Sequence, residues 1–344
     1  MTAKISRRVV IASSIGVLAA PWIMRRAYAD DALVLRCSLD TVPAHARNGA
    51  IKDYLAKIEA ATGGKIKTQI YESGQLFSDL QVGKALLQGQ VEMGVPGTWT
   101  FTGIIPDADF FQLPALYSRS IDALHRVVDG KPGDLIATQV EQKLRSHVLG
   151  PWLDLGFFNW YSTNTPLTSY DSLKGLKIRN AGGAGQAWRT QFVSAIPNTT
   201  PLPNVSLGLS QGTFDGLITT NETVASFQFW ESGIKHALED HQFIGEYVPM
   251  VSLVFWEKLS PELKTIFTDT WRQNIGFYRA NMAASQTRAR DIMKSHGVTI
   301  VEPSLDAVNA LRKKMIADQD QVAKLSRISS EAVSAVTEEL NANG

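Results

Sequence analysis

The sequence predicts an α/β protein made of two α/β units in tandem. Strand-like and helix-like segments alternate in the first part of the chain, and the same alternation restarts near residue 148. Such alternation is typical of a largely parallel sheet covered by helices. No Pro-, Gly- or Ser-rich linker separates the two units, which favours two lobes joined by strands that cross between them. The 344 residues are enough for two domains, or one large one, with a sizeable core.

The first unit follows from short apolar runs, which predict strands, and from apolar residues three or four positions apart, which predict helices. Its first helix should end at Thr62-Gly63-Gly64, since glycine commonly follows a helix. The expected elements are a strand over 33–38, a helix over 48–61, a strand over 65–71, a helix over 79–88 and a strand over 91–95.

The second unit repeats this order and is followed by a helical region. From residue 260 to residue 340 the chain is amphipathic and mostly helical, and Ser260 before Pro261 is a favourable helix start. The expected elements of the unit itself are strands over 148–158, 176–179 and 216–219, and helices over 186–195 and 205–210.

The N-terminus has the pattern of an export signal. Residues 1–29 contain five basic residues and no acidic one, an apolar run from Val9 to Trp22, and an Ala27-Tyr28-Ala29 cleavage pattern. The run is too short to span a membrane as a helix, which needs about 20 residues. The Arg7-Arg8 pair favours the twin-arginine route. We therefore expect cleavage after about Ala29 and a periplasmic mature protein.

Composition argues against several functions. The chain has 34 Lys and Arg residues against 33 Asp and Glu residues, so no basic field favours nucleic-acid binding. A single cysteine, Cys37, excludes an intrachain disulfide framework, and the six histidines show no metal-binding spacing. We therefore expect no metal site, no cofactor and no nucleic-acid partner.

Two glycine-containing motifs resemble functional sites, one a serine nucleophile and the other an anion-binding turn. Gly208-Leu209-Ser210-Gln211-Gly212 matches the G-x-S-x-G elbow of α/β hydrolases, which makes a secreted serine hydrolase using Ser210 an alternative function. That elbow needs a strand before the serine and a helix after it, whereas the expected order here is the reverse. Gly182-Gly183-Ala184-Gly185 can present backbone N–H groups to an anion, although an ordinary tight turn is the favoured explanation.

Arg179 is the strongest candidate for ligand binding. It ends the apolar strand over 176–179, and ligands of open α/β sheets bind beyond the carboxyl ends of the strands. A guanidinium there can hold a carboxylate through two hydrogen bonds, although an interlobe salt bridge is an alternative role. The aromatic residues near expected strand ends, which suit a ligand pocket, are Trp99, Trp152, Phe157, Phe158, Trp160, Tyr161 and Trp188.

Five segments resemble, in their order and spacing, the signatures of one family. They are Gly74-Gln75-Leu76, Asp109 to Pro114, Leu173 to Arg179, Ser210 to Gly216 and Trp256 to Glu262. Over nearly its whole mature length the chain resembles the DctP-like periplasmic solute-binding subunits of TRAP transporters. The segment that ends at Arg179 is the most specific of the five.

This resemblance implies a two-lobed periplasmic-binding-protein fold with crossing hinge strands and a long helix that spans both lobes. It implies a non-enzymatic protein, usually monomeric, that captures a small organic acid and delivers it to TRAP permease subunits in the membrane. Lobe I would comprise residues 30–153 and about 246–285, and lobe II residues 154–245 and about 286–344. An extracytoplasmic sensor that presents its bound acid to a receptor is an alternative.

The resemblance also implies contacts to the ligand. The family arginine that contacts the ligand carboxylate corresponds to Arg179, and the first-lobe contacts correspond to Asp40 and to Gly97-Thr98-Trp99. A carboxylate at Asp40 would repel an anionic ligand unless it accepts from hydroxyl or amine groups. The 157–160 segment contains no arginine, where some members have a second one, so we expect a ligand with one carboxylate.

The rest of the expected site comes from lobe II. Around Thr219 the sequence is Leu217-Ile218-Thr219-Thr220-Asn221, where the family has Q-E-N-P, so this part of the site departs from the pattern. C4-dicarboxylates, 2-oxo or hydroxy acids and sugar acids all stay open as ligands. The full set of expected ligand-binding residues is Arg179, Asp40, Thr98, Trp99, Phe158, Asn159, Trp160, Trp188, Thr219 and Asn221.

Overall fold

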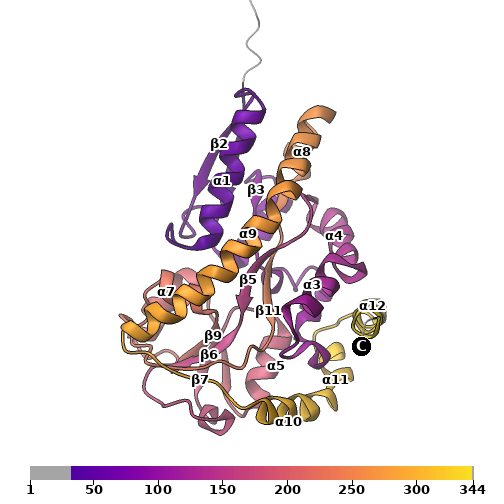
Figure 1. Ribbon diagram of the computed structural model, residues 1–344. Coiled ribbons are helices and arrows are strands. Elements are labelled where there is room, and N and C mark those ends of the chain that lie inside the picture. Colours follow the sequence, from indigo (N-terminus) through magenta and orange to yellow (C-terminus); the bar gives the residue numbers. More distant parts are fainter. Residues whose placement is uncertain (1–31, 343–344) are drawn as a thin grey trace, which may run out of the picture. The chain divides into compact units, whose positions relative to one another are not determined.

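Two main β-sheets organise residues 32–342, the part of the chain that the computed structural model describes (Figure 1). The predicted signal peptide lies outside these residues. The five-stranded sheet has the order β2 (Ile66–Tyr71), β1 (Leu33–Ser38), β3 (Met93–Gly94), β12 (Met250–Ser252) and β4 (Ser146–Val148). The six-stranded sheet has the order β13 (Thr299–Val301), β10 (His236–Leu238), β6 (Asn159–Ser162), β9 (Gly216–Thr219), β7 (Lys177–Asn180) and β8 (Ile196–Thr199). A separate two-stranded ladder consists of β5 (Leu153–Phe157) and β11 (Ile244–Tyr247).

Helices connect these strands in three groups along the chain. Before β4 the chain forms α1 (Ala46–Ala61), α2 (Asp79–Leu87), α3 (Ile121–Asp129), α4 (Lys131–Leu144) and the 3₁₀ helices η1 (Thr98–Thr100), η2 (Pro106–Gln112) and η3 (Pro114–Leu116). Between β6 and β10 it forms η4 (Tyr170–Leu173), α5 (Ala184–Phe192), η5 (Leu202–Asn204), α6 (Val205–Ser210) and α7 (Asn221–Ser226). After β12 it forms α8 (Leu253–Trp256), α9 (Pro261–Ser295), α10 (Leu305–Ile316), α11 (Gln319–Leu325) and α12 (Ser330–Asn341).

The two-lobed fold with crossing hinge strands is confirmed. We call the part built on the five-stranded sheet lobe I and the part built on the six-stranded sheet lobe II. The chain passes from β4 through β5 to β6, and returns from β10 through β11 to β12. Both β6 and β12 pair antiparallel with their neighbours, because each enters its sheet from the other lobe. The other strands of the predicted units pair in parallel, β1 with β2 and β3, and β7 with β8 and β9. The antiparallel β6 and β12 make both sheets mixed, which the sequence did not predict.

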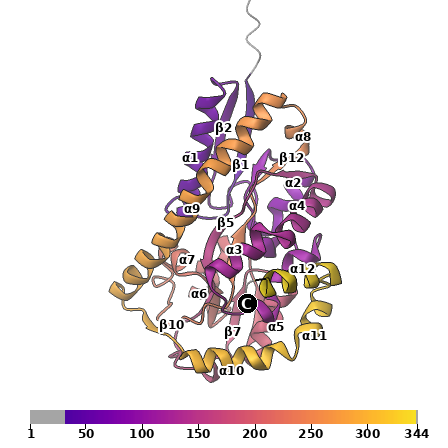
Figure 2. The ribbon, with the colours of Figure 1, turned by 45° about the vertical axis from the view of Figure 1, so that its right-hand side comes forward.

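The long helix of the expected fold is α9, which has 35 residues and is about 52 Å long at 1.5 Å per residue. It contacts α1 of lobe I, the hinge strand β5 and α7 of lobe II, as Figures 1 and 2 show. Its start is the predicted one, since the Ser260 side chain accepts from the Leu263 backbone N–H and Pro261 occupies the first turn. Its buried side chains recur at helical spacing: Phe267, Trp271, Ile275, Tyr278, Met282, Ser285, Ala289 and Met293.

Most predicted elements are present, and two differ in extent. The strand expected over 148–158 is divided into β4 and β5 by Gly150, which has a φ of 154°, and by Pro151, which has no N–H to donate to a ladder. The strand expected over 91–95 is reduced to the two residues of β3. The division matters for the site, because it frees β5 to pair with β11 rather than extend the five-stranded sheet.

The predicted boundaries of the lobes stay a prediction. The chain crosses between the sheets close to the expected positions near residues 153 and 246. However, α12 contacts α3 and α4, which lie in the segment assigned to lobe I.

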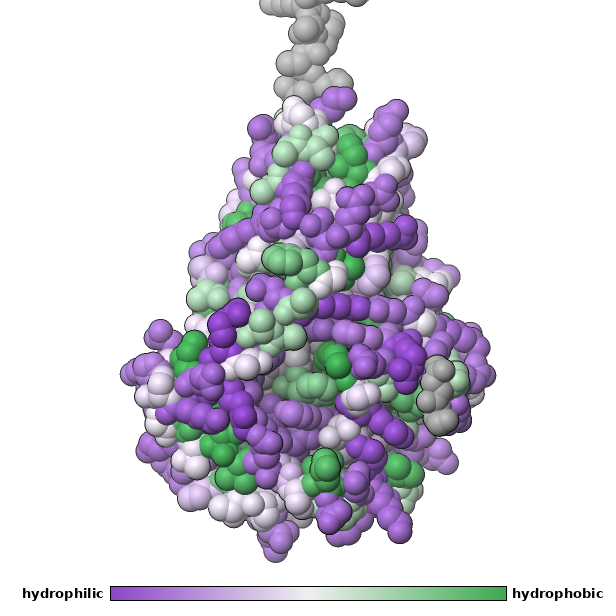
Figure 3. Space-filling model, viewed as in Figure 1, coloured by the Kyte–Doolittle hydropathy of each residue, from purple (hydrophilic) through white to green (hydrophobic). Residues whose placement is uncertain are grey.

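Polar side chains dominate the face of the molecule drawn in Figure 3, where hydrophobic residues form small separate areas. No described helix is long and apolar enough to cross a membrane. The exposed large hydrophobic residues lie on different elements, for example Val34 in β1, Phe277 in α9 and Leu305 in α10. Scattered residues of this kind are normal on a protein surface.

Candidate functional site

A cavity lies between the lobes, at the carboxyl ends of strands from both sheets. Asp40 follows β1 of lobe I, whereas Arg179 and Thr219 lie at the ends of β7 and β9 of lobe II. Strand ends are where open α/β sheets bind ligands. Its free volume is about 10 Å³, room for about one water molecule, so the lobes must open to admit a larger ligand. It is lined by Asp40, Asp79, Trp99, Leu155, Phe158, Arg179, Ala181, Leu202, Thr219, Thr223 and Tyr247.

Arg179 gives this cavity a buried positive charge. The residue is 1% exposed, and its Nε donates to the Thr200 carbonyl at 2.8 Å. Its Nη2 has no hydrogen-bond partner among residues 32–342. Burial lowers the pKa of Arg179, and the nearby Asp79 carboxylate opposes this shift, so the guanidinium stays protonated at neutral pH. A buried charged donor without an acceptor is costly, and a ligand carboxylate would satisfy it.

Asp79 brings an opposing charge from lobe I. It is the first residue of α2, and its Oδ2 lies 3.9 Å from Arg179 Nη2. Its two carboxylate oxygens accept from the Leu202 backbone N–H at 3.3 and 3.2 Å, which ties lobe I to lobe II. Burial raises the pKa of Asp79 to about 6, the Asp40 carboxylate adds to the rise, and Arg179 opposes it. Asp79 is therefore a counter-ion of Arg179 whose charge depends on pH near neutrality.

Asp40 is neutralised by a second arginine, Arg47. Arg47 is fully buried in the first turn of α1, and its Nη2 donates to Asp40 Oδ1 and to Thr41 Oγ1, both at 2.6 Å. Its guanidinium carbon lies 4.0 Å above the centre of the Tyr247 ring. From the sequence, Asp40 was expected to repel an anionic ligand. The ion pair with Arg47 cancels this repulsion, and Asp40 can still accept hydrogen bonds.

Aromatic rings form one wall of the cavity. The Trp99 ring meets Phe158 edge-on at 5.3 Å and Tyr247 at 5.7 Å between ring centres. A Cβ on Gly97 would lie 2.3 Å from the Trp99 indole, so this glycine makes room for the tryptophan ring. Gly97 therefore acts on the cavity through the position of Trp99.

The structure gathers five of the ten predicted ligand-binding residues in the cavity and places the other five elsewhere. The gathered residues are Asp40, Trp99, Phe158, Arg179 and Thr219. The residues that do not line it are Thr98, Asn159, Trp160, Trp188 and Asn221.

The five outlying residues have other contacts. Trp160 Nε1 donates to Asp240 at 2.9 Å, and Trp188 packs on Phe192 at 5.1 Å between ring centres. Thr98 is buried in η1, beside Trp99.

Asn159 and Asn221 line a different cavity, beside the hinge strands. Asn159 Oδ1 accepts from the His241 backbone N–H at 3.0 Å, and Asn221 Nδ2 donates to Glu239 at 2.8 Å. Their amides are thus used inside lobe II and do not reach the cavity at Arg179.

A second interlobe contact joins the start of α1 to α7. Glu222 Oε1 accepts from the Ala46 backbone N–H at 2.8 Å, and its Oε2 lies 3.3 Å from His45 Nε2. Burial raises the pKa of Glu222 to about 7 and lowers the pKa of His45 well below its usual range. Near neutral pH the His45 imidazole is therefore neutral, and the Glu222 carboxyl group is about half ionised.

Six lining residues were not predicted from the sequence, and neither was Arg47 beside Asp40. The six are Asp79, Leu155, Ala181, Leu202, Thr223 and Tyr247. Asp79 and Arg47 lie in the first turns of α2 and α1, where polar residues are commonplace at helix starts. Tyr247 ends β11, about 150 residues from Trp99, and nothing local in the sequence indicates that the two rings meet. Among these residues, only Asp79 could have been suspected from the sequence, because it closely follows the Gly74-Gln75-Leu76 signature.

Ser210 is not arranged as a hydrolase nucleophile. It is an exposed residue at the end of α6, and its Oγ donates back to the Ser206 carbonyl at 2.9 Å. The helix α6 precedes it and the strand β9 follows, which is the reverse of a nucleophile elbow.

Two lobes joined by crossing strands, with a charged cavity between them, characterise the two-lobed solute-binding proteins. The DctP family model, described as bacterial extracellular solute-binding protein, family 7, matches residues 41–325. The chain belongs to this family, which confirms the resemblance found in its sequence. The family is defined by solute binding, in agreement with the expectation that the chain is not an enzyme.

Individual relatives and structures are similar over most of the chain. The C4-dicarboxylate-binding periplasmic protein DctP of Rhodobacter capsulatus is 28% identical and covers 81% of this chain and 82% of its own. The 2,3-diketo-L-gulonate-binding periplasmic protein YiaO of Escherichia coli is 24% identical over 85% of this chain and 89% of its own. The crystal structure of the sugar acid binding protein DctPAm from Advenella mimigardefordensis in complex with galactonate has a TM-score of 0.85 at 20% identity, and covers 91% and 99%. A TRAP solute-binding protein of Sulfurospirillum deleyianum with bound succinate has a TM-score of 0.79 at 22% identity, and covers 89% and 98%.

Proposed function

We propose that this chain is the extracytoplasmic binding subunit of a TRAP transporter, and that it captures a small organic acid and delivers it to a membrane permease. The observation that carries this proposal is the buried Nη2 donor of Arg179, which lacks a partner among the described residues at the cavity between the lobes. The names of the relatives support it, since C4-dicarboxylates, 2,3-diketo-L-gulonate and galactonate all carry carboxylates. Residues 1–29 would direct export and be removed after about Ala29, and the mature protein would act as a monomer in the periplasm.

The lining of the cavity favours an acid with one carboxylate and several hydroxyl groups. Arg47 is already engaged by Asp40, which leaves Arg179 to bind a carboxylate. A second carboxylate on the ligand would meet Asp40 and Asp79, whereas hydroxyl groups can donate to both. Sugar acids and hydroxy acids therefore fit the lining better than C4-dicarboxylates.

Capture would proceed by bending at β5 and β11, the strands that cross between the lobes. A ligand shifts the balance between open and closed forms only by binding the closed form better. Contacts from both lobes to one ligand, with Asp40 on one side and Arg179 on the other, supply that difference.

Thermal melting of the chain with galactonate, other sugar and hydroxy acids, and succinate tests the proposal. A ligand at 100 times its Kd adds about 2.7 kcal/mol, and each kcal/mol raises Tm by about 2–4 °C for a protein of this order of size. We expect a rise of several degrees with a hydroxylated monocarboxylate, and its loss in Arg179→Ala. Arg126→Ala, at an exposed arginine of α3, is the matched control and should keep the full rise. An undiminished rise in Arg179→Ala would overturn the site, and co-purification with a receptor kinase rather than a permease would favour the sensor alternative.

A further inference from the structure

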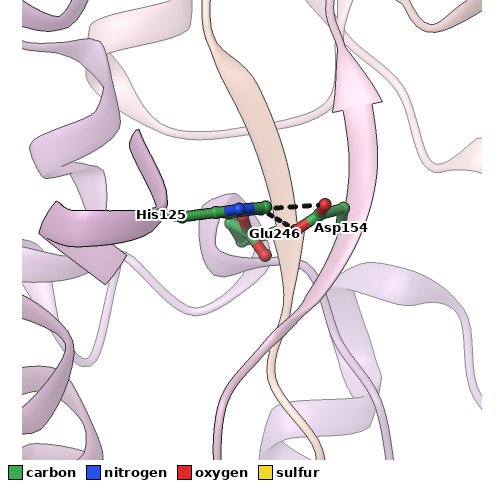
Figure 4. A group of neighbouring side chains, drawn as sticks. All are labelled: His125, Asp154 and Glu246. Carbon is green, nitrogen blue, oxygen red and sulfur yellow. Dashed lines mark hydrogen bonds and ion pairs between the residues drawn. The ribbon is translucent and has the colours of Figure 1, made fainter. Parts of the chain in front are cut away.

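We propose that His125, Asp154 and Glu246 form a binding site for a divalent transition-metal ion beside the hinge strands. His125 lies on α3, Asp154 on β5 and Glu246 on β11, so the three side chains come from three separate elements. Figure 4 shows them pointing toward one another. One ligand atom from each lies within 4.8 Å of the others, a spacing that one ion can bridge. This proposal does not depend on the identity of the ligand in the cavity at Arg179.

The burial and charge of the cluster indicate a missing positive charge. Glu246 is 0% exposed, and neither of its carboxylate oxygens has a hydrogen-bond partner in the described part of the chain. Asp154 is 5% exposed and accepts from His125 Nε2, which lies 3.0 Å from both of its oxygens. Buried carboxylates are costly unless they are paired or coordinate a metal.

The nearby guanidinium of Arg279 balances only one of the carboxylates. Its Nη1 and Nη2 donate to Asp129 at 2.6 and 2.8 Å, and its Nε lies 3.4 Å from Asp154 Oδ1. Three carboxyl groups, those of Asp129, Asp154 and Glu246, therefore face one permanent positive charge. Two negative charges are left over, which is the charge that one divalent cation neutralises.

A proton on Glu246 is the alternative means of neutralisation. Burial, together with the neighbouring Asp154 carboxylate, raises the pKa of Glu246 well above its usual range. A shared proton would remove one of the two excess charges, and with a neutral imidazole the cluster would keep one negative charge. The His125 imidazole supplies a third ligand for a metal ion. Two carboxyl groups that merely share a proton need no such third group.

The donor set favours zinc or a similar borderline ion. One imidazole nitrogen and two carboxylate oxygens suit Zn²⁺, which is held by three protein ligands in sites that keep an open position for water. Ca²⁺ would need six to eight oxygen ligands, about twice the number of protein ligands found here. The site is also reachable, because the His125 side chain is 26% exposed and Asp154 lines a hinge-side cavity of about 240 Å³.

Zinc binding to the purified full chain tests the site. After treatment with a chelator and equilibrium dialysis against zinc at micromolar concentration, we expect about one zinc ion per chain. Glu246→Gln and His125→Gln should each weaken zinc binding by about tenfold or more, since even the residues that only orient metal ligands contribute 10–100-fold. His296→Gln, which removes a histidine stacked on Trp230 in lobe II, is the control for nonspecific binding and should retain the ion.

A second readout separates a bound ion from a merely structural cluster. Zinc should slow amide hydrogen exchange in β5 and β11 of the wild type, because it would tie both strands to α3. It should leave their exchange unchanged in His125→Gln, whose partly exposed side chain can be replaced without loss of the fold. No retained zinc, or equal retention by the wild type and both cluster variants, would overturn the proposal. If Glu246→Gln fails to fold, His125→Gln alone decides.

Discussion

Arg179 Nη2 and Asp79 Oδ2 lie 3.9 Å apart across the boundary between the lobes, opposite in charge and too far apart for a hydrogen bond. Both side chains are almost completely buried. Their attraction stabilises the closed arrangement, yet leaves a donor of Arg179 available to a ligand. A ligand carboxylate at Arg179 would therefore compete with Asp79.

This competition predicts that affinity for an acid such as galactonate depends on Asp79 and on pH. The pKa of Asp79 is raised to about 6, so the side chain is ionised at pH 8 and mostly protonated at pH 5. The ligand stays ionised at pH 5, because carboxyl groups of this kind have pKa values of about 3.3–3.7. We expect the affinity to rise by roughly tenfold between pH 8 and pH 5, equivalent to one pKa unit.

Calorimetry with Asp79→Asn checks the assignment of this effect. The variant should bind galactonate more tightly than the wild type at pH 8, with little dependence on pH, and should melt at a lower temperature without ligand because Arg179 loses its counter-ion. An equal pH dependence in variant and wild type would assign the effect to another group.

The stability of the ligand-free protein should fall as pH rises from about 4.5 to 7, and Glu222 should contribute to that fall. Its folded-state pKa is raised to about 7 by burial, above an unfolded value of about 4.5, so the folded state binds more protons in this window. Glu222→Gln, which cannot ionise, should reduce the loss of Tm between pH 5 and 8.

The reduction should be partial. Burial also raises the pKa of Asp240 to about 7, so Asp240 contributes to the same loss of stability with rising pH. His45 is buried and neutral, so below about pH 6.5 its contribution to stability increases with pH instead. An unchanged pH profile of Tm in Glu222→Gln would show that Glu222 is not the titrating group.

Two Gly→Ala variants should have opposite effects on stability. A Cβ on Gly216 in β9 would lie 2.1 Å from the Tyr161 carbonyl oxygen of the neighbouring strand, so Gly216→Ala must displace backbone. A Cβ on Gly276 in α9 would have no heavy atom within 4 Å. We expect Gly216→Ala to lower the free energy of unfolding by about 1–3 kcal/mol or more, as overpacking does, and Gly276→Ala to raise it by about 0.5–1 kcal/mol. Urea unfolding measures both, and equal effects of the two changes would contradict this packing.

Removal of Arg47 should be more harmful than removal of the whole ion pair. Arg47→Met leaves the Asp40 carboxylate buried without its counter-ion, which typically costs about 3–5 kcal/mol. The double variant Arg47→Met, Asp40→Asn removes the charge as well and should recover part of this loss. Urea unfolding of the two variants compares them, and a single variant as stable as the double one would show that the pair adds no such cost.

Much of the fold could be predicted from local patterns, whereas the pairing of distant strands could not. The strands over 33–38 and 216–219 and the helix over 205–210 have the expected bounds, because their periodicity is set by residues a few positions apart. The direction of β6 and β12 depends on the lobe from which the chain returns, and no local pattern carries that information.

Part of the candidate site could likewise be predicted from local sequence, and part could not. Arg179 was predictable, since it ends a strand and lies in the most specific segment of the family resemblance. Asn159 and Asn221 were plausible by their place in the sequence, yet their amides are bound within lobe II. The three residues of the hinge-side cluster are 29 and 92 positions apart in the chain, so histidine spacing alone could not reveal them.

The position of β12 has a consequence for how the protein is made. This strand, Met250–Ser252, lies inside the five-stranded sheet and pairs with β3 on one side and β4 on the other. A ribosome therefore has to add about 100 residues after β4, which include five of the six strands of the lobe II sheet, before lobe I can complete its own sheet. At about 5–20 residues per second this delay lasts about 5–20 s, during which β3 and β4 present unpaired edges. The nascent chain should thus need protection from aggregation until residue 252 has left the ribosome, and lobe I expressed as residues 32–153 alone should not acquire its native sheet.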